Sequence, residues 1–189
     1  MNTPAHLIFG AAAFARPGAP WVTAAALAGG LAPDCSLYLM ACWHLFVLGT
    51  DPQTVFGQLY FSDSWMRVFR VDNSFVLWGI GLGVALWLRS GWAIAFTGAA
   101  LLHLAFDFPL HHDDGRPHFW PISDWVFESP YSYWDRMHHG QFVGLIEVGI
   151  CLILLGYLGY RFKGTMARIM IAIGVITQIV PGLMWSAIF

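Results

Sequence analysis

The sequence predicts an all-α, polytopic membrane protein with about six transmembrane helices and additional re-entrant or interfacial helices. Of its 189 residues, 58% are hydrophobic and only 11% are charged, whereas ordinary soluble domains are near 25% charged. The mean hydropathy is +0.61, and the chain has room for about six apolar segments of roughly 20 residues each. No repeat or linker divides it, so residues 1–189 form a single integral membrane domain.

The first two apolar stretches predict a helical hairpin. Residues 4–15 and 21–32 are short helices rich in small side chains, and Arg16–Pro20 is a tight turn between them. Because the two arms are antiparallel, the hairpin places His6 and Asp34 at the same open end.

The middle of the chain predicts helices of several kinds. Residues 36–49 are too short to span a membrane and favour a re-entrant or interfacial helix. Residues 50–72 are more polar and indicate a structured loop or an interfacial helix. Residues 74–89 form the next span, whose three glycines favour close helix contact, and residues 92–108 return.

The last third of the chain predicts a loop and two spans. Residues 109–140 contain four prolines and five histidines, which is typical of an ordered loop lying at the membrane interface. Residues 141–189 supply the two C-terminal transmembrane helices.

The most informative stretch is the end of the helix before this loop. His103 and Asp107 are four residues apart, so their side chains lie on one face of a helix. Pro109 cannot continue that helix, which puts the pair in its last turn. Ionisable residues inside a membrane segment are expensive to bury, and they mark a candidate functional site.

Charge is distributed unequally between the connections. The short turns contain only basic charges, and the opposite side contains ten of the eleven acidic residues. By the positive-inside rule, the short turns lie in the cytoplasm and both termini lie outside. The basic residues of the short turns are Arg16, Arg89, Arg161, Lys163 and Arg168.

The same topology brings four candidate metal ligands to the non-cytoplasmic face: His6, Asp34, His103 and Asp107. Two imidazoles and two carboxylates suit a divalent ion, with zinc the first choice. Such an ion lowers the pKa of a bound water to about 7 and makes that water a nucleophile for a phosphoryl or acyl centre.

The loop supplies candidate catalytic residues beside these ligands. His111, His112 and Asp113 follow the helix end directly, and they could act as a general acid, orient a ligand or hold a second ion.

The pattern resembles the bacterial family of YdjM-like, LexA-regulated, membrane-bound metal-dependent hydrolases. The matching elements are Thr3–His6, Leu31–Asp34, Asp72–Ser74, His103–Asp107 and Phe119–Pro121. The likeness covers residues 1–125, and the two C-terminal helices match only as hydrophobic segments. Asn73 stands where the family pattern has a histidine.

This resemblance implies a function and a location. The family is distantly similar to zinc-dependent phospholipase C, which implies that the same four residues bind one or two ions. It also implies a multi-pass protein of the bacterial inner membrane with its site on the periplasmic side. The expected substrate is a phosphoester or ester at the membrane surface, such as a lipid head group, and no nucleic acid is expected.

Two alternatives remain at this stage. The first is a non-enzymatic accessory subunit that packs against partner proteins in a larger membrane complex. The second is an electron-transfer protein in which His6 and His103 are the axial ligands of a haem.

Overall fold

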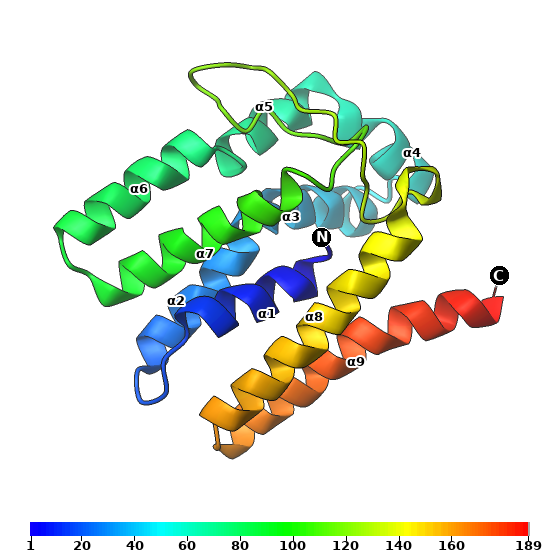
Figure 1. Cartoon of the computed structure of the whole chain (residues 1–189). Helices are drawn as coiled ribbons and strands as arrows, with labels where there is room; N and C mark the ends of the chain where they lie inside the picture. The colour runs from blue at the N-terminus through cyan, green and yellow to red at the C-terminus, as the bar shows by residue number, and fades with distance from the viewer. Residues whose placement is uncertain (189) are drawn as a thin grey trace.

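The computed structural model describes the backbone of residues 1–188 and the side chains of residues 1–180 (Figure 1). Within this part of the chain there are helices and loops but no strand, which confirms the all-α class. The α-helices are α1 (Thr3–Phe14), α2 (Pro20–Leu31), α3 (Cys35–Cys42), α4 (Pro52–Gly57), α5 (Asp63–Asp72), α6 (Phe75–Trp87), α7 (Gly91–Asp107), α8 (Gly140–Arg161) and α9 (Thr165–Ile188).

Fewer helices than expected are long enough to cross a membrane. The described residues contain three long apolar stretches instead of about six: Pro20–Val47, Asp63–Trp87 and Gly140–Arg161. Helix α1 shows why the prediction was wrong in number. Its 12 residues extend only about 18 Å at 1.5 Å per residue, which is less than the roughly 30 Å of a hydrocarbon core.

Pro33 does not end the second helix, although the sequence analysis separated 21–32 from 36–49 at this point. The chain passes through a 3-10 turn, Ala32–Asp34, directly into α3, and a π-helical turn, Trp43–Val47, follows. Proline is tolerated here because it opens a new turn, where its missing N–H has no partner to lose. The two predicted helices are therefore one long, irregular stretch.

Helices α1, α2 and α7 approach closely through small residues. A Cβ atom on Gly29 would lie 2.0 Å from the carbonyl oxygen of Phe96, and one on Gly30 would lie 2.8 Å from that of His6. Gly10 has a similar contact with the Ala26 carbonyl, at 3.0 Å. Small residues let helix backbones come this close. As a result, the ends of these helices converge.

The glycines of α6 behave differently from the prediction. Only Gly81 lies close to another helix, with its Cβ position 3.3 Å from Thr97 Cγ2. Among the described residues, Gly79 and Gly83 have no atom of another element within 4 Å of such a Cβ position, so the expectation of close helix contact is wrong for these two residues.

The short turns gather at one end of the molecule and the long loop lies at the other (Figure 1). Arg161, at the end of α8, donates hydrogen bonds to the carbonyl oxygens of Ala12 and Ala15 at the end of α1. The opposite end contains the N-terminus, the end of α7 and residues 108–139.

The long loop is fixed by hydrogen bonds to the start of α6 and between its own two arms. The Phe75 amide donates to the carbonyl of His118 at 2.8 Å, and the Ser74 hydroxyl donates to the carbonyl of Trp120. Further along, the Ser129 amide donates to the His111 carbonyl at 3.0 Å. These bonds hold the polar loop over the end of α7.

Candidate metal centre

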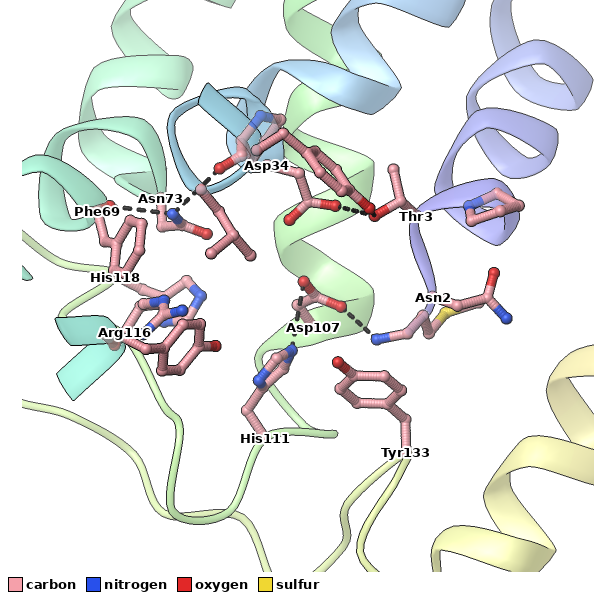
Figure 2. Close-up of a pocket in the computed structure, with 16 residues that line it drawn as sticks. Asn2, Thr3, Asp34, Phe69, Asn73, Asp107, His111, Arg116, His118 and Tyr133 are labelled. Carbon is pink, nitrogen blue, oxygen red and sulfur yellow. Dashed lines mark hydrogen bonds and ion pairs between the residues drawn. The ribbon is translucent and has the colours of Figure 1, made fainter. Parts of the chain in front are cut away.

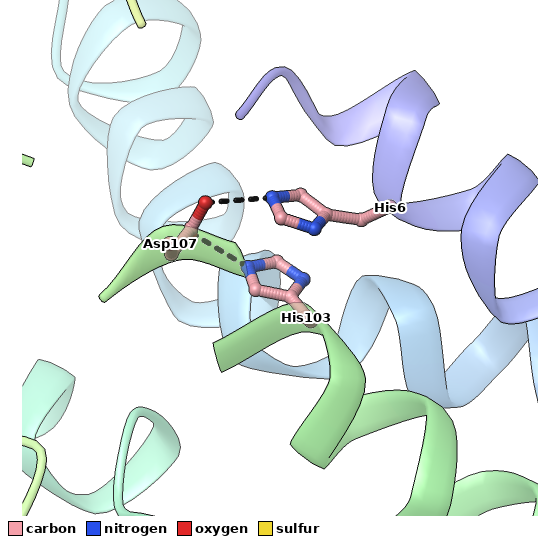
Figure 3. A group of neighbouring side chains, drawn as sticks. All are labelled: His6, His103 and Asp107. Carbon is pink, nitrogen blue, oxygen red and sulfur yellow. Dashed lines mark hydrogen bonds and ion pairs between the residues drawn. The ribbon is translucent and has the colours of Figure 1, made fainter. Parts of the chain in front are cut away.

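The tightest group of potential metal ligands consists of His6 from α1 and His103 and Asp107 from α7 (Figure 3). One nitrogen or oxygen of each residue lies within 4.8 Å of the others, and all three residues are buried. His6 Nε2 is 2.9 Å from Asp107 Oδ1, and His103 Nε2 is 3.1 Å from Asp107 Oδ2. Three of the four predicted ligands therefore meet at one point.

His103 is oriented by the backbone. Its Nδ1 lies 2.8 Å from the carbonyl oxygen of Gly30 and donates a hydrogen bond to it. In a neutral imidazole the lone pair is then on Nε2, which faces Asp107 at 3.1 Å and Asp34 Oδ1 at 3.7 Å. A lone pair facing two carboxylates needs a proton or a cation between them. In a metal-binding histidine, the ring nitrogen that does not bind the metal commonly donates a hydrogen bond to a carbonyl oxygen, and this bond fixes the tautomer.

His6 has buried nitrogens without partners. It is 2% exposed, and neither ring nitrogen has a hydrogen-bond partner among residues 1–180. Its Nε2 contacts Asp107 without the alignment of a hydrogen bond. A buried polar atom left without a partner costs about 1–3 kcal/mol. A cation coordinated by Nε2 would remove part of this penalty.

The separations within the group are of the order found between the ligand atoms of a divalent ion. With bonds of about 2.0–2.1 Å, the ligand atoms around a tetrahedral zinc ion lie roughly 3.3 Å apart. His6 Nε2 is 2.9 Å from Asp107 Oδ1 and His103 Nε2 is 3.1 Å from Asp107 Oδ2, and one ligand atom of each residue lies within 4.8 Å of the others. The donor set of the cluster therefore fits a divalent ion.

Asp107 is surrounded by nitrogen groups. Besides the two histidines, the α-amino group of Met1 lies 2.5 Å from Oδ1, and His111 Nε2 lies 3.4 Å from Oδ2. The close partners of this carboxylate among the described residues are thus one ammonium group and three imidazoles, and an imidazole nitrogen can bind a metal cation.

Asp34 lies beside the group and not within it. One carboxylate oxygen accepts a hydrogen bond from the Thr3 hydroxyl at 2.5 Å, and the other is 3.7 Å from His103 Nε2. The Thr3 hydroxyl also contacts the Tyr38 hydroxyl at 2.7 Å. Asp34 is therefore held next to the centre, at the distance of an additional ligand or of an outer partner.

The candidate catalytic residues of the loop separate into two groups. His111 lies against the centre, and its Nδ1 is 2.9 Å from Asp114 Oδ2. Burial alone would lower its pKa, but the carboxylates of Asp107 and Asp114 outweigh burial and raise the pKa of His111 to about 9. His112 faces away, with Nδ1 2.7 Å from the Ser129 carbonyl oxygen, and Asp113 is exposed.

His111 and Asp107 open onto a polar cavity of about 260 Å³ (Figure 2). Several polar residues of its wall carried no role in the sequence analysis. They are Thr3, Tyr38, Tyr60, Arg116 and Tyr133. His112 and Asp113 are not among the described residues that line it. Consecutive loop residues point in different directions, and of the three loop candidates His111 is the one that lines this cavity within the described part of the chain.

Asn73 also lines the cavity, and its amide has a structural role. Its Nδ2 donates to the carbonyl oxygens of Phe69, at 3.0 Å, and of Pro33, at 3.4 Å. These bonds join the end of α5 to the turn that carries Asp34. Asn73 therefore helps to position an acidic residue of the site.

Comparison of the chain with protein-family models, curated proteins and solved structures gave no match.

Proposed function

We propose that the chain is an integral membrane protein. The three long apolar stretches support this because their side chains are largely uncovered by the rest of the protein. On α8, Leu145 is 74% exposed and Ile153 is 73% exposed. Large apolar patches of this kind mark membrane or protein contacts, and a lipid environment would cover them along the full length of the helix.

In this proposal the end with the short turns faces the cytoplasm. Its basic residues support this orientation by the positive-inside rule. Exposed aromatic residues near the same end, Trp21, Trp87, Trp92 and Tyr160, fit the aromatic belt of a membrane interface. The metal centre then lies on the periplasmic side of a bacterial inner membrane, as the sequence analysis expects.

The proposed activity is metal-dependent hydrolysis of a phosphoester or ester at this face. His6, His103 and Asp107 would hold a divalent ion, zinc being the best fit, with Asp34 available as a further ligand. When bound, the ion would polarise a substrate oxygen and lower the pKa of a water molecule. The observation that carries the proposal is the pair of buried imidazoles, one of them oriented by a backbone carbonyl, that converge on one carboxylate.

The residues of the chain supply the rest of the site. The cavity admits a substrate next to Asp107, and the ion pair with Asp114 holds the ring of His111 at its wall. His111 is the residue placed to exchange a proton with a leaving group. The elements around His6, Asp34 and His103–Asp107 are also those that carry the resemblance to YdjM-like hydrolases.

The geometry favours this function over electron transfer through a haem. The rings of His6 and His103 are stacked, with centroids 3.5 Å apart and planes inclined by 8°. Axial ligands approach iron from opposite faces of a porphyrin, and two stacked rings leave no space for the porphyrin between them.

The test is hydrolysis by the detergent-purified protein. We expect zinc-dependent cleavage of a nitrophenyl phosphoester or acetate ester that is abolished by chelation and restored by zinc. Asp107→Asn should lose the activity, whereas His44→Ala, a histidine that contacts Thr50 outside the cavity, should retain it. A metal-loaded protein with no activity on either class of ester would favour the accessory-subunit alternative.

A further inference from the structure

Arg116 is a buried cation in the wall of the polar cavity. The residue is 7% exposed, and its guanidinium lies over two aromatic rings, with Cζ 4.5 Å from the ring centre of Tyr60 and 4.1 Å from that of Phe69. Among residues 1–180, no carboxylate forms an ion pair with it, and Nη1 has no hydrogen-bond partner. Its charge is therefore buried without a direct anionic partner.

This arrangement leaves Nη1 of Arg116 without a hydrogen-bond partner among residues 1–180. The rings contact the face of the guanidinium, whereas its N–H groups point outward from the edge of the plane. Burying an ionised group is expensive unless it is paired and hydrogen-bonded. An anion in the cavity would supply both the missing charge and the missing acceptors.

His118 adds a second unsatisfied atom at the same wall. It is 3% exposed, and its Nδ1 donates to the carbonyl oxygen of Arg116 at 2.8 Å. Its Nε2 is buried and has no partner within the described residues. Burial lowers the pKa of His118 to about 4, so the ring is neutral near pH 7 and Nε2 is an acceptor. It can accept a hydrogen bond from a hydroxyl group or from water.

Two tyrosines contribute further donors. Tyr60 and Tyr133 both line the cavity. Burial raises the pKa of Tyr60 to about 12, against the effect of nearby Arg116, and burial also raises the pKa of Tyr133. Both phenols are therefore protonated and can donate hydrogen bonds to a bound oxygen atom.

The opposite side of the cavity contains the carboxylates of Asp34 and Asp107. Figure 2 shows them between Thr3 on one side and Arg116 and His118 on the other. A divalent ion at the metal centre would neutralise these two charges. Asp114 Oδ2 lies 2.9 Å from His111 Nδ1, so among residues 1–180 the loaded cavity would still contain no carboxylate in an ion pair with Arg116.

We propose that Arg116, together with His118 and Tyr133, forms a phosphoryl-binding subsite beside the metal centre, and that the substrate is a phosphoester. This inference rests on the proposed hydrolase function. A guanidinium fork matches two oxygens of a phosphoryl group, and a tyrosine hydroxyl can donate to a third. His118 Nε2 suits the protonated oxygen of the group or a water molecule beside it.

The phosphoryl group can belong to a soluble compound or to a lipid. An apolar cavity of about 560 Å³ lies between α1, α2, α8 and α9, and Pro4 lines both this cavity and the polar one. Because the two cavities adjoin at Pro4, the apolar cavity would accommodate an acyl chain of a lipid substrate next to the site. The shared chemistry is the phosphoryl group, and the experiment must separate the two sources.

The test measures binding of inorganic phosphate to the zinc-loaded, detergent-purified protein by calorimetry. We expect Arg116→Gln to weaken phosphate binding about tenfold or more, because a charge-assisted bidentate contact is lost, while the zinc content is unchanged. Arg116→Lys keeps the charge but not the fork and should give an intermediate loss. Arg70→Gln is the matched control, since Arg70 lies over the ring of Trp120 and pairs with Asp124 at 3.7 Å.

Each outcome has a separate meaning. A zinc-loaded wild type that binds no phosphate overturns the subsite and leaves the metal centre standing, whereas a wild type without zinc overturns both proposals. Phosphate affinity unchanged in Arg116→Gln and Arg116→Lys also overturns the subsite. If Arg116→Gln does not fold, the phosphate affinity of Arg116→Lys, compared with that of the wild type, tests the subsite. Displacement of phosphate by vesicles containing phosphatidic acid, but not by phosphatidylcholine vesicles, identifies the lipid source.

Discussion

His6 and His103 come from different helices and stack with their ring centroids 3.5 Å apart and their planes inclined by only 8°. Both Nε2 atoms face oxygens of the same carboxylate, Asp107. Two imidazolium rings in this position would repel each other. One divalent ion satisfies both nitrogens without charging either ring, and this stacked pair is therefore the core of the proposed centre.

Because the two rings stack, one substitution can remove the ligand nitrogen of His6 and keep the packing of the ring against His103. In His6→Phe the ring keeps its position against His103 but has no nitrogen, so we expect the folded protein to persist and its zinc affinity to fall. The loss should exceed the roughly 10–100-fold that removal of an outer-shell partner costs. Zinc titration and thermal unfolding of the same sample measure the two effects, and unaltered zinc affinity would contradict the ligand role of His6.

Close packing of α2 against α7 predicts a strong effect of one added methyl group. In Gly29→Ala the new Cβ would lie 2.0 Å from the carbonyl oxygen of Phe96, which is backbone and cannot move aside. We expect a loss of at least 1–3 kcal/mol, the usual order for overpacking, measured as a lower midpoint of thermal unfolding. Gly83→Ala is the control, because its Cβ would meet no atom of the described residues within 4 Å and helix propensity favours alanine by about 1 kcal/mol. Equal midpoints for the two variants would contradict this packing.

A buried polar network joins α1, α8 and α9. Glu147 Oε1 accepts hydrogen bonds from the amide and the side chain of Asn2, and Gln178 Nε2 donates to Asn2 Oδ1 at 3.2 Å. Glu147→Gln keeps the acceptor, so we expect it to retain most of the stability. Glu147→Ala removes the acceptor of the Asn2 amide and weakens the pairing of its side-chain nitrogen, and it should cost about 1–3 kcal/mol. The thermal unfolding midpoints of the two variants measure this difference. An equal loss of stability in both variants would contradict the role of Glu147 as a hydrogen-bond acceptor and indicate that its charge is what stabilises the protein.

The low pKa of His118 predicts acid sensitivity. Burial lowers this pKa to about 4, against the hydrogen bond to the Arg116 backbone and the carboxylate of Asp107, while the nearby His111 and the charge of Arg116 act in the same direction as burial. An unfolded histidine titrates near 6.5. Between these values the unfolded chain binds a proton that the folded chain does not. Stability therefore falls as the pH drops from about 6.5 to 4, by up to roughly 3 kcal/mol.

His118→Gln should remove this part of the pH dependence, and unfolding midpoints at pH 7 and pH 5 measure it. His44→Gln serves as the control. If the difference between the two pH values is the same in His118→Gln as in the wild type, the buried neutral histidine is not the cause.

The sequence predicted the helical class and much of the site because both depend on local spacing. His103 and Asp107 meet since i and i+4 share a helix face, and His6 joins them because α1 and α2 form the expected hairpin. The number of long helices was wrong because α1, with 12 residues, and α7, with 17, are shorter than a full span.

The cavity wall was harder to predict. Arg116, Tyr60 and Tyr133 reach the cavity only through the path of the long loop and the elements after α3, which the spacing of residues does not determine. One feature of the sequence could have indicated Arg116: it is a basic residue between Gly115 and Pro117, in a loop rich in histidine and aspartate. His112 and His111 are adjacent, and only the fold shows that they face opposite ways.

The central claim is that the buried group of His6, His103 and Asp107 holds a divalent ion. The most direct measurement is the metal content of the detergent-purified protein by elemental analysis, after reconstitution with zinc, beside His103→Ala and Asp107→Ala. The account predicts one or two zinc ions per chain in the wild type and in a His44→Ala control, and loss of zinc in both site variants while they remain folded. A wild type that binds no metal, or site variants that retain all of it, would contradict the account.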